Sequence, residues 1–180
     1  MKNSLTQKDG LPIPVKGARE IFSLLAEKHL TLSTAESCTG GNIAHNITLI
    51  PGSSEIFKGG IVSYSNEVKH MVLGVREKTL AEHGAVSRQV VEQMAEGACR
   101  VCDTDCSVAT SGIAGPGGAV PGKPVGTVWI AARYHDTIRS GLFMFSGSRE
   151  EIISIATSAA LSLLYSTITS PDNAPSHDGF

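Results

Sequence analysis

The chain has 180 residues, of which 41% are hydrophobic and 18% are charged, and its formal net charge is −2. This length suits one domain with a sizeable core, and the composition is that of an ordinary globular protein. The weak net acidity and the lack of any Lys/Arg run exclude the concentrated basic face of a nucleic-acid-binding protein.

Targeting features are lacking as well. Residues 1–6 have no apolar core of a signal peptide, and no apolar run approaches the roughly 20 residues of a membrane span. We therefore expect a cytoplasmic protein without membrane contact, in which Cys38, Cys99, Cys102 and Cys106 are reduced. Cys99 and Cys102 form a Cys-x-x-Cys pair, but no fourth ligand with zinc-like spacing follows. We expect the last three cysteines to pack in the core, with helical spacing if the helix runs that far.

Helices and strands interleave along the chain. A flexible arm (1–14) and a flexible tail (171–180) are expected on either side of one domain at 15–170. Apolar periodicity and capping residues predict helical segments at 15–29, 40–50, 53–58, 67–73, 76–83, 87–100 and 149–168. Short apolar runs and alternation predict strands at 30–35, 61–64, 107–109, 125–134 and 137–145. The last two strands form a β-hairpin. The order indicates an α/β fold, a three-layer α/β/α sandwich with a mixed sheet that includes this C-terminal β-hairpin.

Two strand-to-glycine turns, at 36–41 and 110–118, are the candidate ligand sites. In open α/β sheets, ligands collect at the carboxyl ends of strands. Neither turn contains the Gly-Lys-Ser/Thr of a P-loop or the Gly-x-Gly-x-x-Gly of a dinucleotide site. The backbone N–H groups of residues 115–118 still suit a phosphate.

Ser37 is the candidate nucleophile in the first turn, with Cys38 as its rival. Tyr64 and Lys69 are candidate bases, because a lysine or a tyrosine can accept the serine proton if its surroundings, such as burial or a nearby cation, lower its pKa. Glu36 either pairs with Lys69 or caps the helix that follows. The residues alone do not choose among these alternatives.

Two further features concern ligands. Arg149, at the start of the last helix, is a candidate anion ligand. The six histidines show no His-Glu-x-x-His spacing, so we expect neither a metal nor a cofactor.

Four separated motifs resemble the CinA C-terminal domain family over roughly residues 16–168. They are TAESCTGG at 34–41, GIVSYSNEVK at 60–69, SGIAGP at 111–116 and KPVGTV at 123–128. They occur in the family's order. Within the family the chain resembles the stand-alone nicotinamide-nucleotide amidases, so we expect a form without the pyrophosphatase-like domain that precedes this domain in longer members.

The resemblance implies hydrolysis of nicotinamide mononucleotide to nicotinic acid mononucleotide and ammonia, in pyridine-nucleotide salvage. It implies that Ser37 is the nucleophile, activated by Tyr64 and Lys69. The amide N–H groups around Thr39 and Gly40 are then expected to stabilise the oxyanion. The full set of expected substrate-binding residues is Glu36, Thr39, Gly40, Ser111, Gly112, Ala114, Gly115 and Arg149.

The chain departs from the family pattern near Arg149. Ser148 and Ile153 stand where the family commonly has an acidic residue and a second arginine, which argues against a two-arginine phosphate clamp. The alternative function is a non-catalytic nucleotide-binding or interaction domain of this competence- and DNA-damage-associated family. An apolar hairpin and a small-residue closing helix are compatible with a homo-oligomer.

Overall fold

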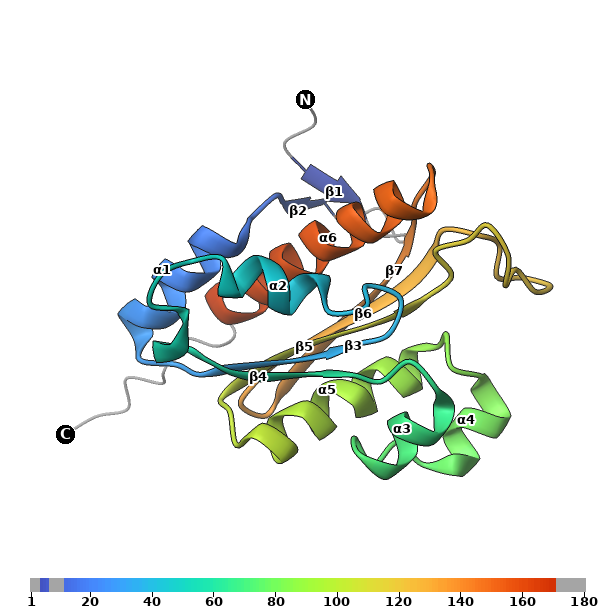
Figure 1. Ribbon diagram of the computed structural model, residues 1–180, viewed down its shortest axis with the longest axis horizontal. Helices are drawn as coiled ribbons and strands as arrows, with labels where there is room; N and C mark the ends of the chain where they lie inside the picture. Colours follow the sequence, from blue (N-terminus) through green and yellow to red (C-terminus); the bar gives the residue numbers. More distant parts are fainter. Residues whose placement is uncertain (1–3, 7–11, 171–180) are drawn as a thin grey trace.

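A five-stranded mixed sheet forms the centre of the computed structural model, which describes residues 4–6 and 12–170 (Figure 1). Its strands are β3 (Leu32–Glu36), β4 (Phe57–Val62), β5 (Cys106–Gly112), β6 (Thr127–Tyr134) and β7 (Thr137–Met144). Their order across the sheet is β4-β3-β5-β6-β7. β3 runs parallel to both β4 and β5, whereas β6 and β7 pair antiparallel. The predicted mixed sheet with a C-terminal hairpin is confirmed.

Helices cover both faces of this sheet (Figure 1). One face carries α1 (Ala18–Lys28), α2 (Asn42–Thr48) and α6 (Arg149–Thr169). The other carries α3 (Asn66–Met71), α4 (Glu77–His83) and α5 (Arg88–Cys102). A short 3₁₀ turn, η1 (Ser53–Glu55), precedes β4. The three-layer α/β/α prediction is therefore confirmed.

Side chains of each strand alternate between the two layers. Leu32 and Val108 lie in the core cluster with α1, α2 and α6, whereas Ala35 and Ala109 lie in the cluster with α5. This alternation decides which polar residues at the strand ends point toward α5. The odd-numbered residues of β3 and β5 do so.

Helix α6 is the longest element, and its length and apolar composition are those of a membrane-crossing helix. The sequence prediction that no apolar run approaches this length overlooked it. In the structure, 61% of its apolar window is buried, as in a core helix. Ser148 begins the helix by accepting a hydrogen bond from the N–H of Glu151, whose carboxylate accepts from the Ser148 N–H.

Two boundaries near the candidate site differ from the sequence prediction. β4 spans Phe57–Val62, so it begins earlier than the predicted strand at 61–64 and ends before Tyr64. Gly59 and Gly60 lie inside it, although glycine is a weak strand signal. β5 extends to Gly112, so Ser111 belongs to the strand rather than to the glycine turn. Polar and small residues are poor strand signals, and pairing with β6 overrides them.

The N-terminal arm predicted at 1–14 contains an antiparallel pair, β1 (Ser4–Thr6) and β2 (Pro12–Pro14), that the sequence did not reveal. The predicted tail at 171–180 lies outside the described residues. Cys99 and Cys106 pack in the core as predicted, but α5 ends at Cys102, so Cys106 belongs to β5 rather than to a longer helix.

Candidate active site

Three parallel strands end side by side at the site. Glu36 of β3 pairs with Val62 of β4 and with Thr110 of β5. One residue further, the Ser37 N–H donates to the Thr110 carbonyl (3.0 Å), and the Ser63 N–H donates to the Glu36 carbonyl (2.8 Å). These bonds hold Ser37 in sheet register at the start of the turn into α2. Its position is therefore fixed by the sheet rather than by a loop.

Glu36 is buried, with 1% of its surface exposed, and points to the opposite face from Ser37. Its carboxylate accepts hydrogen bonds from the Thr39 hydroxyl (2.7 Å) and from the N–H groups of Gly41 (3.0 Å), Ile43 (3.0 Å) and Ala44 (2.9 Å). The last two N–H groups belong to the first turn of α2, where a negative charge also interacts favourably with the helix dipole. Of the two alternatives for Glu36, the capping role is the one that the structure shows.

Lys69 lies directly against Ser37. The helix α3 that carries it begins at Ser65, whose hydroxyl accepts from the Val68 N–H (3.2 Å). The Lys69 side chain is 1% exposed, and its Nζ donates to the Ser63 carbonyl (2.6 Å) and to Ser37 Oγ (3.1 Å). Burial lowers the pKa of the Lys69 ammonium, because water no longer stabilises its charge. A lysine of this kind is suited to accept a proton from the serine.

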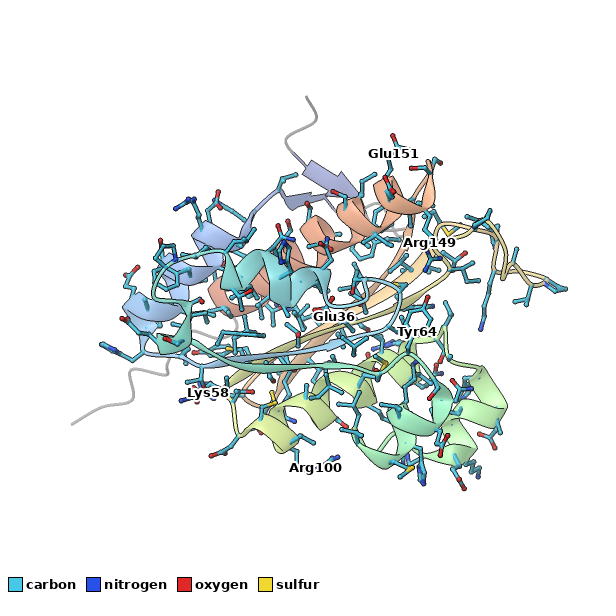
Figure 2. All side chains as sticks on the ribbon, in the orientation of Figure 1. Glu36, Lys58, Tyr64, Arg100, Arg149 and Glu151 are labelled. Carbon is cyan, nitrogen blue, oxygen red and sulfur yellow. The ribbon has the colours of Figure 1, made fainter. Side chains whose placement is uncertain are left out.

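The segment after α3 is fastened to α5. Arg100 Nη2 donates to the Leu73 carbonyl (2.8 Å), and Arg100 is labelled on α5 in Figure 2. Gly97 lies so close to the Leu73 carbonyl that a Cβ would overlap it. These contacts fix the short helix that presents Lys69.

A cavity of about 290 Å³ opens beside the Ser37–Lys69 pair, close to the lower end of the roughly 300–1,000 Å³ typical of small-molecule sites. It lies between the strand ends, α3 and the α4–α5 loop. Its lining residues are Ser37, Cys38, Tyr64, Asn66, Lys69, Ala85, Val86, Ser111, Gly112, Ile113, Ala114, Gly115, Gly117, Gly118 and Arg149. Most of the residues predicted for the site therefore meet around one cavity.

Tyr64 and Arg149 form the outer part of this cavity, and Figure 2 shows them at the same end of the sheet. Arg149 Nη2 donates to the Tyr64 hydroxyl (2.9 Å), and Nη1 donates to the Gly115 carbonyl (2.7 Å). Tyr64 is 62% exposed. Both acceptors are neutral, and Arg149 forms no ion pair with a carboxylate among the described residues.

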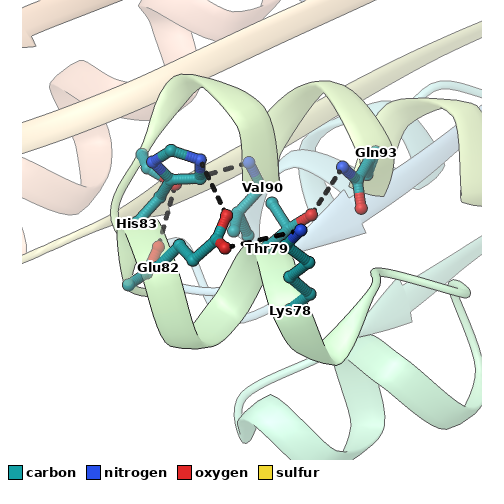
Figure 3. A network of polar contacts seen from close by, with 8 residues as sticks. Lys78, Thr79, Glu82, His83, Val90 and Gln93 are labelled. Carbon is teal, nitrogen blue, oxygen red and sulfur yellow. Dashed lines mark hydrogen bonds and ion pairs between the residues drawn. The ribbon is translucent and has the colours of Figure 1, made fainter.

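The α4–α5 loop supplies the wall opposite the serine. The buried Ser111 hydroxyl donates to the Ala85 carbonyl (2.7 Å) and so fixes this loop to β5. Figure 3 shows the contacts that join α4 to α5. Gln93 Nε2 of α5 donates to the Thr79 hydroxyl of α4 (3.1 Å). The wall is therefore held from both sides.

Three predicted substrate-binding residues are not placed on the cavity. Glu36 and Thr39 are buried and hydrogen-bonded to each other, and Thr39 also bonds the Thr110 hydroxyl (2.8 Å). The Gly40 N–H donates to the Ser37 carbonyl (3.1 Å), which removes it as a free oxyanion donor. The Glu36 carboxylate, the Thr39 hydroxyl and the Gly40 N–H are therefore engaged within the turn, whereas the Thr39 N–H has no acceptor among the described residues.

Sequence reasoning missed several lining residues. Asn66, the first residue of α3, lines the cavity but is not among the predicted site residues. Ala85 and Val86 carry no chemical signal at all, since they line the cavity through loop placement. Cys38 lines the cavity, but it is 6% exposed and burial raises the pKa of its thiol to about 12. That pKa leaves very little thiolate at neutral pH and weakens Cys38 as a nucleophile.

The residues of this site lie within the part of the chain that matches known families and curated proteins. The CinA C-terminal domain family matches residues 15–168. The "CinA-like protein" of Endomicrobium trichonymphae is 50% identical over 141 residues, which cover 78% of this chain and 33% of that protein. The chain spans about a third of the length of several such curated relatives. In contrast, "Nicotinamide-nucleotide amidohydrolase PncC" of Escherichia coli K12 is 48% identical over 151 residues, which cover 82% of this chain and 90% of that protein.

Solved structures agree with the fold. The competence damage-inducible protein A (ComA) of Klebsiella pneumoniae superposes with a TM-score of 0.82 at 35% identity, covering 85% of this chain and 95% of that one. The competence/damage inducible protein CihA of Agrobacterium tumefaciens gives a TM-score of 0.81 at 41% identity, covering 83% and 92%. Both are similar to this chain over nearly their whole length.

Proposed function

The chain belongs to the CinA C-terminal domain family, and we propose that it is an amidohydrolase that converts nicotinamide mononucleotide to nicotinic acid mononucleotide and ammonia in pyridine-nucleotide salvage. The observation that carries the proposal is the buried Lys69 Nζ at 3.1 Å from Ser37 Oγ, beside a cavity of small-molecule size. The substrate is suggested by the similarity to the Escherichia coli amidohydrolase over 90% of that protein.

Lys69 acts first as a general base in this proposal. Its lowered pKa favours the neutral amine, whose lone pair takes the Ser37 proton while Ser37 Oγ attacks the carboxamide carbon. The tetrahedral intermediate collapses as Lys69 passes that proton to the amide nitrogen, and ammonia leaves. Water then attacks the ester on Ser37, its proton moves to Lys69 and on to Ser37 Oγ, and the carboxylic acid is released. Substrate and water are consumed one to one, and no cofactor enters any step.

The choice of Lys69 over Tyr64 rests on contacts. Lys69 already bonds Ser37, whereas the Tyr64 hydroxyl bonds Arg149 and is largely exposed. Tyr64 is assigned to the cavity mouth, where it orients the guanidinium. The Thr39 N–H is our proposed oxyanion donor, since it has no acceptor among the described residues while the neighbouring Gly40 N–H is engaged.

Substrate binding is assigned to Arg149 and to the backbone of residues 112–118. The guanidinium is exposed and bonds only neutral acceptors, so a phosphate would be a stronger partner. Ile153 lies one helical turn beyond Arg149 on α6 and packs against the core. This position therefore offers no second arginine to the phosphate. A single cation and backbone N–H groups then hold the phosphate. We place this activity in the cytoplasm, where the four free cysteines stay reduced.

Ammonia release tests the proposal. Purified wild-type protein at micromolar concentration is incubated with nicotinamide mononucleotide, and ammonia and nicotinic acid mononucleotide are quantified. Equal amounts of both products support the amidase. Binding of the nucleotide by calorimetry without any product would instead favour a non-catalytic nucleotide-binding domain.

A further inference from the structure

Three serines lie in one row across the end of the sheet. Continuing the register by one residue past Glu36 places Ser37 beside Ser63 on one side and Ser111 on the other. The bonds of the Ser37 and Ser63 N–H groups follow this continued register. All three side chains belong to the face that carries α3 and α5. Ser63 and Ser111 therefore flank Ser37.

The flanking serines differ in their hydrogen bonds. The Ser111 hydroxyl donates to the Ala85 carbonyl. The Ser63 hydroxyl is fully buried and has no hydrogen-bond partner among the described residues. A buried hydroxyl without a partner is costly, and native structures hold few of them. Its presence beside Ser37 and Lys69 requires an explanation.

Lys69 supplies the missing partner through an N–H group that has no other acceptor in the site. Neutral Nζ has two N–H groups, and the ammonium has three. The Ser63 carbonyl accepts one of them at 2.6 Å, and a second faces Ser37 Oγ. The third N–H of the ammonium needs another acceptor inside the site.

Other polar groups near Lys69 accept weakly or have a partner of their own. The Cys38 thiol is a weak acceptor, the Tyr64 hydroxyl already accepts from Arg149, and the Ser111 hydroxyl donates to the Ala85 carbonyl. The Ser63 hydroxyl differs from these groups because it has no partner among the described residues. Three titratable or charged groups line the cavity together with Lys69. They are Cys38 in the turn after β3, and Tyr64 and Arg149 at the mouth. The Glu36 carboxylate faces α2.

We propose that Ser63 is a positioning residue whose hydroxyl accepts a hydrogen bond from the Lys69 ammonium formed when Ser37 gives up its proton. This inference rests on the proposed amidase function. The Ser63 hydroxyl belongs to the residue whose carbonyl already accepts from Nζ, which keeps the two groups near each other. A hydrogen bond from the charged ammonium is stronger than one from the neutral amine, so this contact favours the protonated state of Lys69.

The test compares two buried hydroxyls that both have no partner. Ser63→Ala removes the proposed acceptor, and Thr34→Val removes the unpaired hydroxyl of Thr34, which lies within β3 and faces the α2 side. Ammonia release from nicotinamide mononucleotide is measured across pH for wild type and both variants, together with the melting temperature.

We expect Ser63→Ala to lower kcat roughly tenfold, with KM little changed, because hydrogen bonds to charged groups are among the stronger ones. The acidic limb of the kcat profile should move to lower pH by roughly one unit, since an ammonium that lacks an acceptor loses its proton more easily. Thr34→Val should keep both quantities. Neither variant should melt at a lower temperature, because each loses only an unsatisfied group.

Two results would overturn the inference while leaving the amidase intact: Ser63→Ala with wild-type kcat and pH limb, or the same loss in Thr34→Val. Failure of the amidase proposal looks different, since wild type itself would then release no ammonia.

Discussion

Glu36 and Lys69 are two buried charged residues at the same end of the sheet, on opposite faces, and they differ in how far the protein satisfies them. The Glu36 carboxylate accepts four hydrogen bonds from the turn and from α2. The Lys69 Nζ bonds one carbonyl and one serine hydroxyl, beside the Ser63 hydroxyl, which has no partner in the described part of the chain. Full satisfaction holds the Glu36 carboxylate and the turn in one arrangement, whereas incomplete satisfaction leaves Lys69 able to change protonation.

Replacing Lys69 gives the largest expected change. In Lys69→Met the stem is kept and the base is lost, so we expect kcat to fall by roughly a thousandfold, with KM within a few fold. Steady-state ammonia release measures both constants. A dominant rise in KM would instead make Lys69 a substrate-binding residue. Its contrast with the structural role of Glu36 would then no longer rest on proton transfer.

The pH dependence examines the same lysine without mutation. Because burial lowers the Lys69 pKa, the neutral base persists to lower pH than for an exposed lysine. Activity should rise with pH along an acidic limb whose midpoint lies below the ordinary lysine range near 10.5, and this limb should be absent from the residual activity of Lys69→Met. A midpoint at or above that range would contradict the assigned base.

Replacing Glu36 should affect stability first. Glu36→Ala leaves several donors of the turn without an acceptor, and we expect a loss of roughly 3 kcal/mol or more of unfolding free energy. Urea unfolding measures it, with Lys69→Met as the matched variant of a buried charge that should lose less. If Glu36→Ala were as stable as wild type, its carboxylate would not be the cap that fixes the turn.

Replacing Arg149 tests a charged residue at the exposed end of the site, in contrast to the two buried ones. Its guanidinium bonds two neutral acceptors, so we expect it to bind substrate rather than to stabilise the fold. Arg149→Ala should raise KM roughly tenfold for the mononucleotide and change the melting temperature little. A fall in kcat at constant KM would instead place Arg149 in the chemical step.

Tyr64→Phe is expected to have the smallest effect. It removes one acceptor of Arg149 and leaves the Ser37–Lys69 contact in place, so kcat/KM should fall only a few fold. Steady-state rates below and above KM give kcat/KM and kcat separately, and a loss of kcat as large as that of Lys69→Met would restore Tyr64 as the base.

The layer order and the hairpin were predictable because apolar alternation and periodicity are strong signals. The strand ends were not, since glycines inside β4 and a serine near the end of β5 resemble turns until a neighbouring strand pairs with them. Motif resemblance located Ser37 and Lys69, but only the fold shows that they touch. The sequence does not reveal that the Thr39 hydroxyl and the Gly40 N–H bond within the turn, so the choice of the Thr39 N–H as the proposed oxyanion donor needed the structure.

Ammonia release by Ser37→Ala, beside Cys38→Ala as its neighbour control, tests the central claim most directly. The account predicts that Ser37→Ala releases no ammonia above the blank, while Cys38→Ala keeps most of the wild-type rate, because the raised pKa of that thiol leaves it protonated. Turnover by Ser37→Ala together with a silent Cys38→Ala would contradict the account and make this a thiol enzyme.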